Sequence, residues 1–222
     1  MAKYELVKED SIVHKGHTLY RIRCLWKRGL SNSAEYGKLG GYVESEKNLS
    51  QKGKCWIEDD AKVYGNAVVD GDATLFMNAE AYDNAIVTGS AFISQNSKIY
   101  ENAKVFGGTM YKDSQIYGNA KMFFGVTLSG KSQVFGDAEL GNSKSYTTSI
   151  KVDDNAKVCG TASLQGKVTV KGDAVLSLGV ITSGTFDGSE NPRKQIPANK
   201  KLEQEIDNEL DDLWNRREYQ NK

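Results

Sequence analysis

His14 and His17 are the two histidines of the chain, and imidazole is the side chain whose ordinary pKa lies closest to neutral pH. Such a group can act as a general base or as a metal ligand. A catalytic zinc site of three histidines cannot come from a single copy of this chain. We therefore expect no metal site. His14 and His17 remain candidate catalytic bases, and the simpler interpretation is that both are ordinary hairpin residues.

The two histidines fall in a segment that predicts a β-hairpin. Residues 11–23 form two β-prone runs, and Lys15-Gly16 between them is a turn signal. The histidines would then flank the turn. Any catalytic role would require the rest of the chain to bring substrate to this hairpin.

Most of the chain follows a six-residue repeat. Nine hexads of the form small–x–aliphatic–x–x–Asn/Asp run over residues 55–108, a five-residue unit follows at 109–113, and eleven more hexads run over 114–179. The two apolar positions are two residues apart and therefore share one face of a short strand. The last two positions favour Gly and Asn/Asp, which tolerate the positive φ of a sharp corner. The repeat predicts an all-β solenoid in which hexads form the flat sides of a prism.

This repeat resembles that of the hexapeptide-repeat left-handed β-helix family. The resemblance covers residues 55–179 and implies a single-stranded, left-handed parallel β-helix of about seven triangular coils, with three hexads in each coil. The leader around Leu39-Gly-Gly-Tyr-Val-Glu44 and Asn48-Leu-Ser resembles that of an uncharacterised group of bacterial and phage proteins with YGNAKV-type repeats. That second resemblance permits a phage-encoded, host-directed inhibitor.

The flanking segments divide the chain into four parts. We expect a β-rich cap and lead-in at 1–54, the β-helix at 55–184, a linker at 185–198 and an amphipathic helix at 199–222. The helix would bury one apolar face on its own prism or on another subunit, and it would serve as an oligomer or partner helix. The residues of that face are Leu202, Ile206, Leu210, Leu213 and Trp214.

Aromatic side chains occupy an outward position after the inward aliphatic residue. With three hexads per coil, five of them would stack in one column; these are Tyr64, Tyr82, Tyr100, Tyr117 and Phe135. A second face would carry Phe106 and Phe123, with Lys104 and Lys121 two residues before them. The columns could be structural ladders, a subunit or partner interface, or a surface for a flat anionic ligand such as a nucleotide.

Two further expectations concern the regularity of the coil. Tyr111 and Tyr146 fall in positions predicted to point inward, and the prism should be distorted at the short unit that contains Tyr111. We expect no long loop between coils. The segment Gly125–Ser132 matches the phosphate-loop pattern letter for letter. Since its residues continue the hexads instead of preceding a helix, we do not predict a nucleotide site there.

Charge and composition limit the function classes. The 29 Lys/Arg balance the 29 Asp/Glu, which argues against a general nucleic-acid binder. Residues 1–30 are basic and residues 200–214 are acidic, and these opposite charges could set the orientation or the rate of association with a partner more than the affinity. The chain shows no apolar run of membrane length, no signal peptide and only three cysteines. We expect a cytoplasmic protein.

Three functions remain open. The first is a non-enzymatic binding or scaffold protein without a cofactor, which engages a protein partner and self-associates as a dimer or trimer. The second follows from the family resemblance, because hexapeptide-repeat enzymes are mostly acyltransferases or γ-class carbonic anhydrases. It is an acyltransferase that uses acetyl-CoA at an intersubunit site, with His14 or His17 as base. The third is a nucleotide-binding sponge on the aromatic faces.

Overall fold

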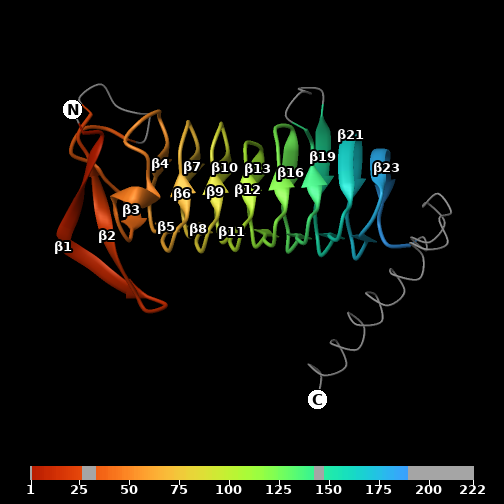
Figure 1. Ribbon diagram of the computed structural model, residues 1–222, viewed down its shortest axis with the longest axis horizontal. Helices are drawn as coiled ribbons and strands as arrows, with labels where there is room; N and C mark the ends of the chain where they lie inside the picture. The colour runs from red at the N-terminus through yellow and green to blue at the C-terminus, as the bar shows by residue number, and fades with distance from the viewer. Residues whose placement is uncertain (1, 27–33, 143–147, 190–222) are drawn as a thin grey trace, which may run out of the picture. The chain divides into compact units, whose positions relative to one another are not determined.

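The computed structural model describes residues 2–26, 34–142 and 148–189 of the 222-residue chain, and these residues form a parallel β-solenoid (Figure 1). Its coils lie side by side along the long axis, from the N-terminal cap to β23. Strand partners in successive coils are parallel and 18 residues apart where the repeat is regular, as for Lys62 and Glu80. Eighteen residues are three hexads, which matches the expected coil. The expected C-terminal helix at 199–222 lies outside the described residues.

Three stacks of strands form the sides, which we call faces A, B and C. Face A carries one rung per coil: β3 (Leu39–Val43), β5 (Lys62–Val63), β8 (Glu80–Ala81), β11 (Lys98–Ile99), β14 (Gln115–Ile116), β17 (Gln133–Val134), β20 (Lys157–Val158) and β22 (Val175–Leu176). Face B consists of β4 (Trp56–Ile57), β7 (Thr74–Leu75), β10 (Phe92–Ile93), β13 (Thr109–Met110), β16 (Val126–Leu128) and β19 (Ser149–Val152). Face C consists of β6 (Val68–Val69), β9 (Ile86–Val87), β12 (Lys104–Val105), β15 (Lys121–Met122) and β18 (Glu139–Leu140).

The last strands continue two faces at once. β21 (Ser163–Val170) pairs with β18 on face C and with β19 on face B, and β23 (Val180–Phe186) pairs with β21 along both parts. At the other end β1 (Tyr4–His14) and β2 (His17–Cys24) form an antiparallel hairpin joined to face A through β3. Because β3 pairs in parallel with β5, the stack has eight rungs on face A, one more than the hexads alone supply.

The core is one continuous column of inward side chains. The small and the aliphatic residue of each hexad are buried, as in Ala61 and Val63 or Ala67 and Val69. Each buried aliphatic side chain contributes roughly 1.5–3 kcal/mol relative to an exposed one. The described residues contain one helical element, the 3₁₀ turn η1 (Glu46–Asn48) in the first coil.

The two corner positions have different roles. Positive φ occurs at the fifth position of the hexad, in Gly65 and Gly71 and also in Asp83, Gln95 and Glu101. The sixth position has positive φ where it is glycine, at Gly125 and Gly179, but not where it is Asn or Asp. Its Asn and Asp side chains instead bond from coil to coil, in a ladder that runs through Asn66, Asn84, Asn102, Asn119 and Asp137 at 2.9–3.2 Å. At the sixth position the expectation of positive φ therefore holds for Gly and is wrong for Asn and Asp.

The short coil is built differently from the sequence expectation. Met110, not Tyr111, is the inward residue, because it pairs with Ile93 and Leu128 and is fully buried. The missing residue belongs to the corner at Gly107-Gly108. A Cβ at Gly107 would lie 2.6 Å from the ring of Phe124, so the aromatic ring packs on the glycine. Tyr111 is half-exposed.

The coil is also interrupted once, contrary to expectation. Gln133 pairs with Lys157, 24 residues away instead of 18, so the chain between β18 and β19 contains one hexad more than a coil needs. Parallel pairing resumes at Ser149. Tyr146, which the sequence places inward, lies in this segment at 143–147, outside the described residues.

Candidate functional site: the hairpin tip and the tyrosine column

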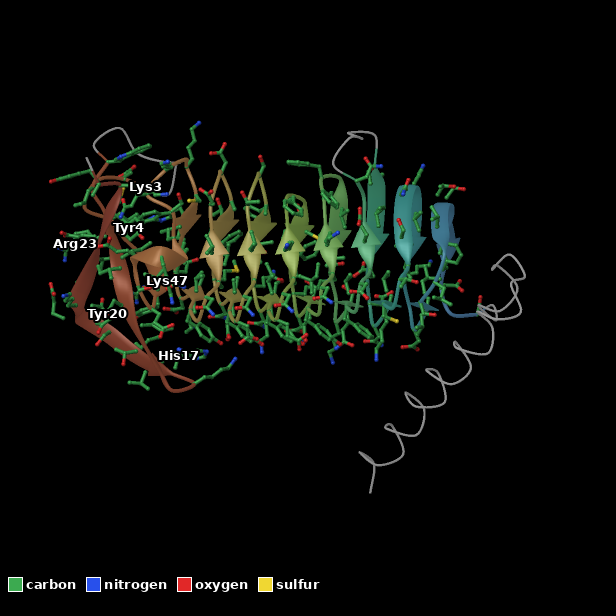
Figure 2. All side chains as sticks on the ribbon, viewed as in Figure 1. Lys3, Tyr4, His17, Tyr20, Arg23 and Lys47 are labelled. Carbon is green, nitrogen blue, oxygen red and sulfur yellow. The ribbon has the colours of Figure 1, made fainter. Side chains whose placement is uncertain are left out.

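The hairpin tip lies against the outer surface of face A. The β1–β2 hairpin is confirmed, with His14 opposite His17 across the turn Lys15-Gly16, where both turn residues have positive φ. The register shifts between Val7 and Ser11, an irregularity of the kind that bends an antiparallel pair. Figure 2 shows His17 close to the tip of the hairpin. The tip reaches side chains of three successive coils.

Glu80 on β8 is the main anchor of the tip. Its Oε2 lies 3.0 Å from Lys15 Nζ and 3.3 Å from His14 Nε2, and it accepts a hydrogen bond from the Tyr64 hydroxyl at 3.0 Å. Burial of this carboxyl would raise its pKa. The pKa is nevertheless below its ordinary value, because Lys15, Tyr64 and His14 stabilise the ionised form. Glu80 is therefore a carboxylate at neutral pH.

Glu44 holds the other side of the tip. Its Oε1 lies 3.1 Å from His17 Nδ1, and its Oε2 accepts a hydrogen bond of 2.8 Å from the backbone N–H of Gly65. The contact with His17 is the main reason that the pKa of Glu44 is lowered. Each histidine of the hairpin thus has its own carboxylate on the solenoid.

The tyrosine column runs along face A next to these anchors. Its rings stack nearly parallel, with centroids 4.8–5.1 Å apart and interplanar angles of 2–7°, in the order Tyr64, Tyr82, Tyr100, Tyr117 and Phe135. The spacing equals the distance between neighbouring rungs of a sheet. The predicted arrangement is therefore present, and whether it binds a ligand stays a prediction.

The stacking determines which parts of the rings in the column are accessible to a ligand. The faces of the inner rings are covered by their neighbours, so edges and hydroxyl groups remain. At the first ring, His14 meets Tyr64 edge-on at 5.4 Å and His17 lies tilted at 5.1 Å, while Lys15 Nζ sits 4.7 Å from the centre of Tyr82. Tyr64 is consequently only 3% exposed.

The hydroxyl groups of the column stay protonated over a wide pH range. Burial is the main cause, and nearby carboxylates such as Glu80 add to it by disfavouring a second negative charge. The pKa of Tyr82 is raised to about 12, and those of Tyr64, Tyr100 and Tyr117 are raised as well. The column is thus a row of neutral hydrogen-bonding groups.

The second aromatic pair lies on face C. Phe106 and Phe123 stack at 5.0 Å and 15°, and Lys104 is the parallel strand partner of Lys121. Lys121 Nζ lies 3.6 Å from Glu139 Oε2 in a solvent-exposed ion pair. Both lysines are exposed. Each of the two phenyl rings has one face covered by the other ring.

The phosphate-loop match at Gly125–Ser132 is part of the coil. Val126 and Leu128 are buried in β16, and the chain continues into β17 instead of a helix. The helix N-terminus that such a loop uses to bind phosphate is missing from this part of the structure. The prediction that this segment continues the coil is confirmed.

The remaining predictions concern the C-terminal helix, metal binding, membrane spans and the cysteines. The oligomer or partner residues Leu202, Ile206, Leu210, Leu213 and Trp214 lie outside the described residues. Within the described ranges, no three His, Cys, Asp or Glu side chains gather as a metal site would require, and no helix has the length and apolar character to cross a membrane. The three cysteines are buried and none is part of a disulfide bond.

Sequence reasoning identified the histidines and the rings but missed Glu44, Glu80 and Lys15. All three are charged residues of a kind that is common on protein surfaces: Lys15 in the hairpin turn, Glu44 in the lead-in after β3 and Glu80 in a hexad. Their shared role becomes apparent only when the hairpin lies against the coil and brings these charges together. Comparison with protein-family models and with curated proteins finds no match for this chain.

Proposed function

We propose that the protein is a non-enzymatic binding or scaffold protein that holds a protein partner on the uncovered half of face A. The proposal includes a coil of the left-handed hexapeptide-repeat type, with the terminal segments adding contacts. The observation that carries it is the division of the tyrosine column. The hairpin covers its first ring, while Tyr100, Tyr117 and Phe135 continue the same surface and are half-exposed.

The hairpin is an internal example of what this surface binds. A polypeptide turn fits against stacked ring edges, and its polar groups find partners on the neighbouring rungs. The uncovered half offers comparable groups, since Tyr100 donates a hydrogen bond of 3.2 Å to Gln115 and Gln133 lies on the next rung. Rigid aromatic groups with a polar rim are typical of protein interfaces.

The charges of the uncovered half differ from those under the hairpin. The carboxylates of face A that bind the tip are Glu44 and Glu80, whereas the outward residues beside the exposed rings are Lys98, Gln115, Gln133 and Lys157. A partner with acidic groups could pair there with Lys98 and Lys157, and the exposed carboxylate of Glu101 lies near Tyr100 and Tyr117. Electrostatic complementarity of this kind steers association and selects the partner.

The test compares partner capture by three forms of the full chain. Gln133→Glu introduces a negative charge beside Phe135 without altering the stack, and Thr127→Glu introduces the same charge on face B. A protein that the wild type and Thr127→Glu retain and that Gln133→Glu releases supports the proposal. Equal capture by all three forms would contradict it.

A second candidate is the acetyl-CoA-dependent acyltransferase. Two observations favour it: His14 and His17 each lie beside a carboxylate, an arrangement that can orient an imidazole as a general base, and the coil is interrupted between β18 and β19. Thiol release from acetyl-CoA in the presence of amine acceptors tests it. Turnover that persists in both His14→Ala and His17→Ala would remove these residues from the reaction.

The nucleotide-binding sponge is the weakest candidate. It would need an open ring face beside Lys104 and Lys121, and the stacking of Phe106 on Phe123 uses one face of each ring. Calorimetric titration with ATP, compared between wild type and Lys104→Ala, tests it directly. If the wild type and Lys104→Ala bind ATP with equal heat, the nucleotide does not bind beside Lys104.

A further inference from the structure

The two ends of the solenoid are treated differently by the sequence. At the N-terminal end of the described structure, β1 is an edge strand, and its one partner among the strands assigned there is β2. It carries Glu5, Lys8, Glu9 and Asp10 and has a register irregularity between Val7 and Ser11. Charged side chains and bulges are the usual means by which proteins prevent an edge strand from pairing with another chain.

The last coil lacks the charges, while its strand β23 has a register irregularity against β21 between Leu164 and Lys167. Among the described strands β22 pairs only with β20 and β23 only with β21, so the last coil has an unpaired edge on all three faces. Residues 175–186, which form this coil, contain no charged residue and no proline. Figure 1 shows β23 as the terminal rung of the stack.

The same coil exposes apolar side chains. Val180 is 68% exposed, the largest exposure of an apolar residue in the last coil, and Leu178 is half-exposed. Ile181 and Phe186 pack on the core but are only partly buried, and no described strand lies beyond β23 in the stack. An uncharged edge with an open core end is suited to strand addition, in which backbone hydrogen bonds supply affinity.

We propose that this end binds a second copy of the chain, end to end, through the edges of β22 and β23. A two-fold axis across the end would make the strands of the two copies antiparallel and would continue the sheets through the interface. Self-pairing suits an uncharged segment because identical charges would otherwise face each other. This surface takes no residue from the stretch between Tyr100 and Phe135 and is independent of the partner binding proposed there.

The experiment measures the mass of the full chain in solution by light scattering at several concentrations. We expect twice the chain mass for the wild type. Ser183→Lys combined with Thr185→Lys puts two like charges on the exposed edge of β23, and we expect this variant to be a monomer. The control is Thr109→Lys combined with Thr127→Lys on the same face in mid-stack, which should remain a dimer.

A second measurement separates loss of pairing from loss of folding. Backbone amides of residues 180–186 should exchange slowly with deuterium in the wild-type dimer and at least tenfold faster in the β23 variant, while amides of the middle coils stay protected in both. A wild-type monomer at every concentration would overturn the proposal. So would a dimer that the β23 substitutions leave intact.

Discussion

Glu80 and Lys15 form a 3.0 Å ion pair that joins residues 65 positions apart and fixes the hairpin tip to the third rung of face A. The carboxylate is 12% exposed and the ammonium 49%, so the pair is half-sheltered from solvent. Such a pair contributes more than an exposed one, and Glu80 also serves His14 and Tyr64. Glu80 is therefore the main anchor of the tip, while the base of the hairpin is joined to face A by the pairing of β2 with β3.

Replacing this carboxylate should loosen the hairpin without unfolding the coil. We expect Glu80→Gln to lower the free energy of unfolding by about 1–2 kcal/mol, because charge-assisted hydrogen bonds to Lys15 and Tyr64 weaken. Urea titration measures this. The matched control is Glu139→Gln, which breaks an exposed 3.6 Å pair with Lys121 and should cost less than about 0.5 kcal/mol. Equal losses in the two variants would show that Glu80 has no special role.

The tyrosine column should make the protein sensitive to alkali. A tyrosine whose pKa is raised on folding contributes stability that is present below the unfolded pKa of about 10 and is lost as pH rises toward the folded value. For Tyr82 that value is about 12. We expect Tyr82→Phe to keep its place in the stack, as Phe135 does, and to flatten the loss of stability above about pH 10.

The control for this experiment is Tyr36→Phe, since Tyr36 is 61% exposed and lies outside the column. Urea unfolding at a series of pH values should give the same alkaline slope for Tyr36→Phe and the wild type. A Tyr82→Phe slope indistinguishable from both would mean that burial of the column does not shift this titration.

The corner glycines should differ according to what surrounds them. Gly89 has φ of +65° and its added Cβ would overlap the carbonyl oxygen of Phe106, whereas Gly16 has φ of +85° and open space around it. We expect Gly89→Ala to cost roughly 3 kcal/mol or more and Gly16→Ala about 1–2 kcal/mol. Thermal unfolding followed by circular dichroism compares them. A Gly16→Ala protein as unstable as Gly89→Ala would argue against steric closure between coils.

The corner at Gly107-Gly108, which is one residue shorter than the others, determines whether Met110 or Tyr111 points inward. Replacing each of these two neighbouring residues by alanine tests that assignment. Met110 is fully buried and Tyr111 half-exposed. We expect Met110→Ala to destabilise by about 2–5 kcal/mol through the cavity it leaves, and Tyr111→Ala by less than half of that. Denaturant midpoints measured under identical conditions decide the question. The reverse order would restore Tyr111 to the inward position that the hexad count assigns to it.

The sequence alone determined the features that depend on local pattern. A small and an aliphatic residue two positions apart must face one side of a strand, so Ala61 and Val63 could be assigned to the core and Tyr64, Tyr82 and Tyr100 to one outward column. Each hexad repeats the same choice, and twenty repetitions make the solenoid unambiguous.

Only the tertiary structure decided where the regular pattern is broken. One coil is a residue shorter than the others, and the sequence pattern is the same whichever of its corners lacks that residue. The structure places the short corner at Gly107, where the ring of Phe124 from the following coil packs on the glycine. The docking of His14, Lys15 and His17 on Glu80 and Glu44 likewise joins segments that no local pattern relates. Burial is encoded residue by residue, whereas corner closure and hairpin docking depend on contacts between coils and on charges far apart in the chain.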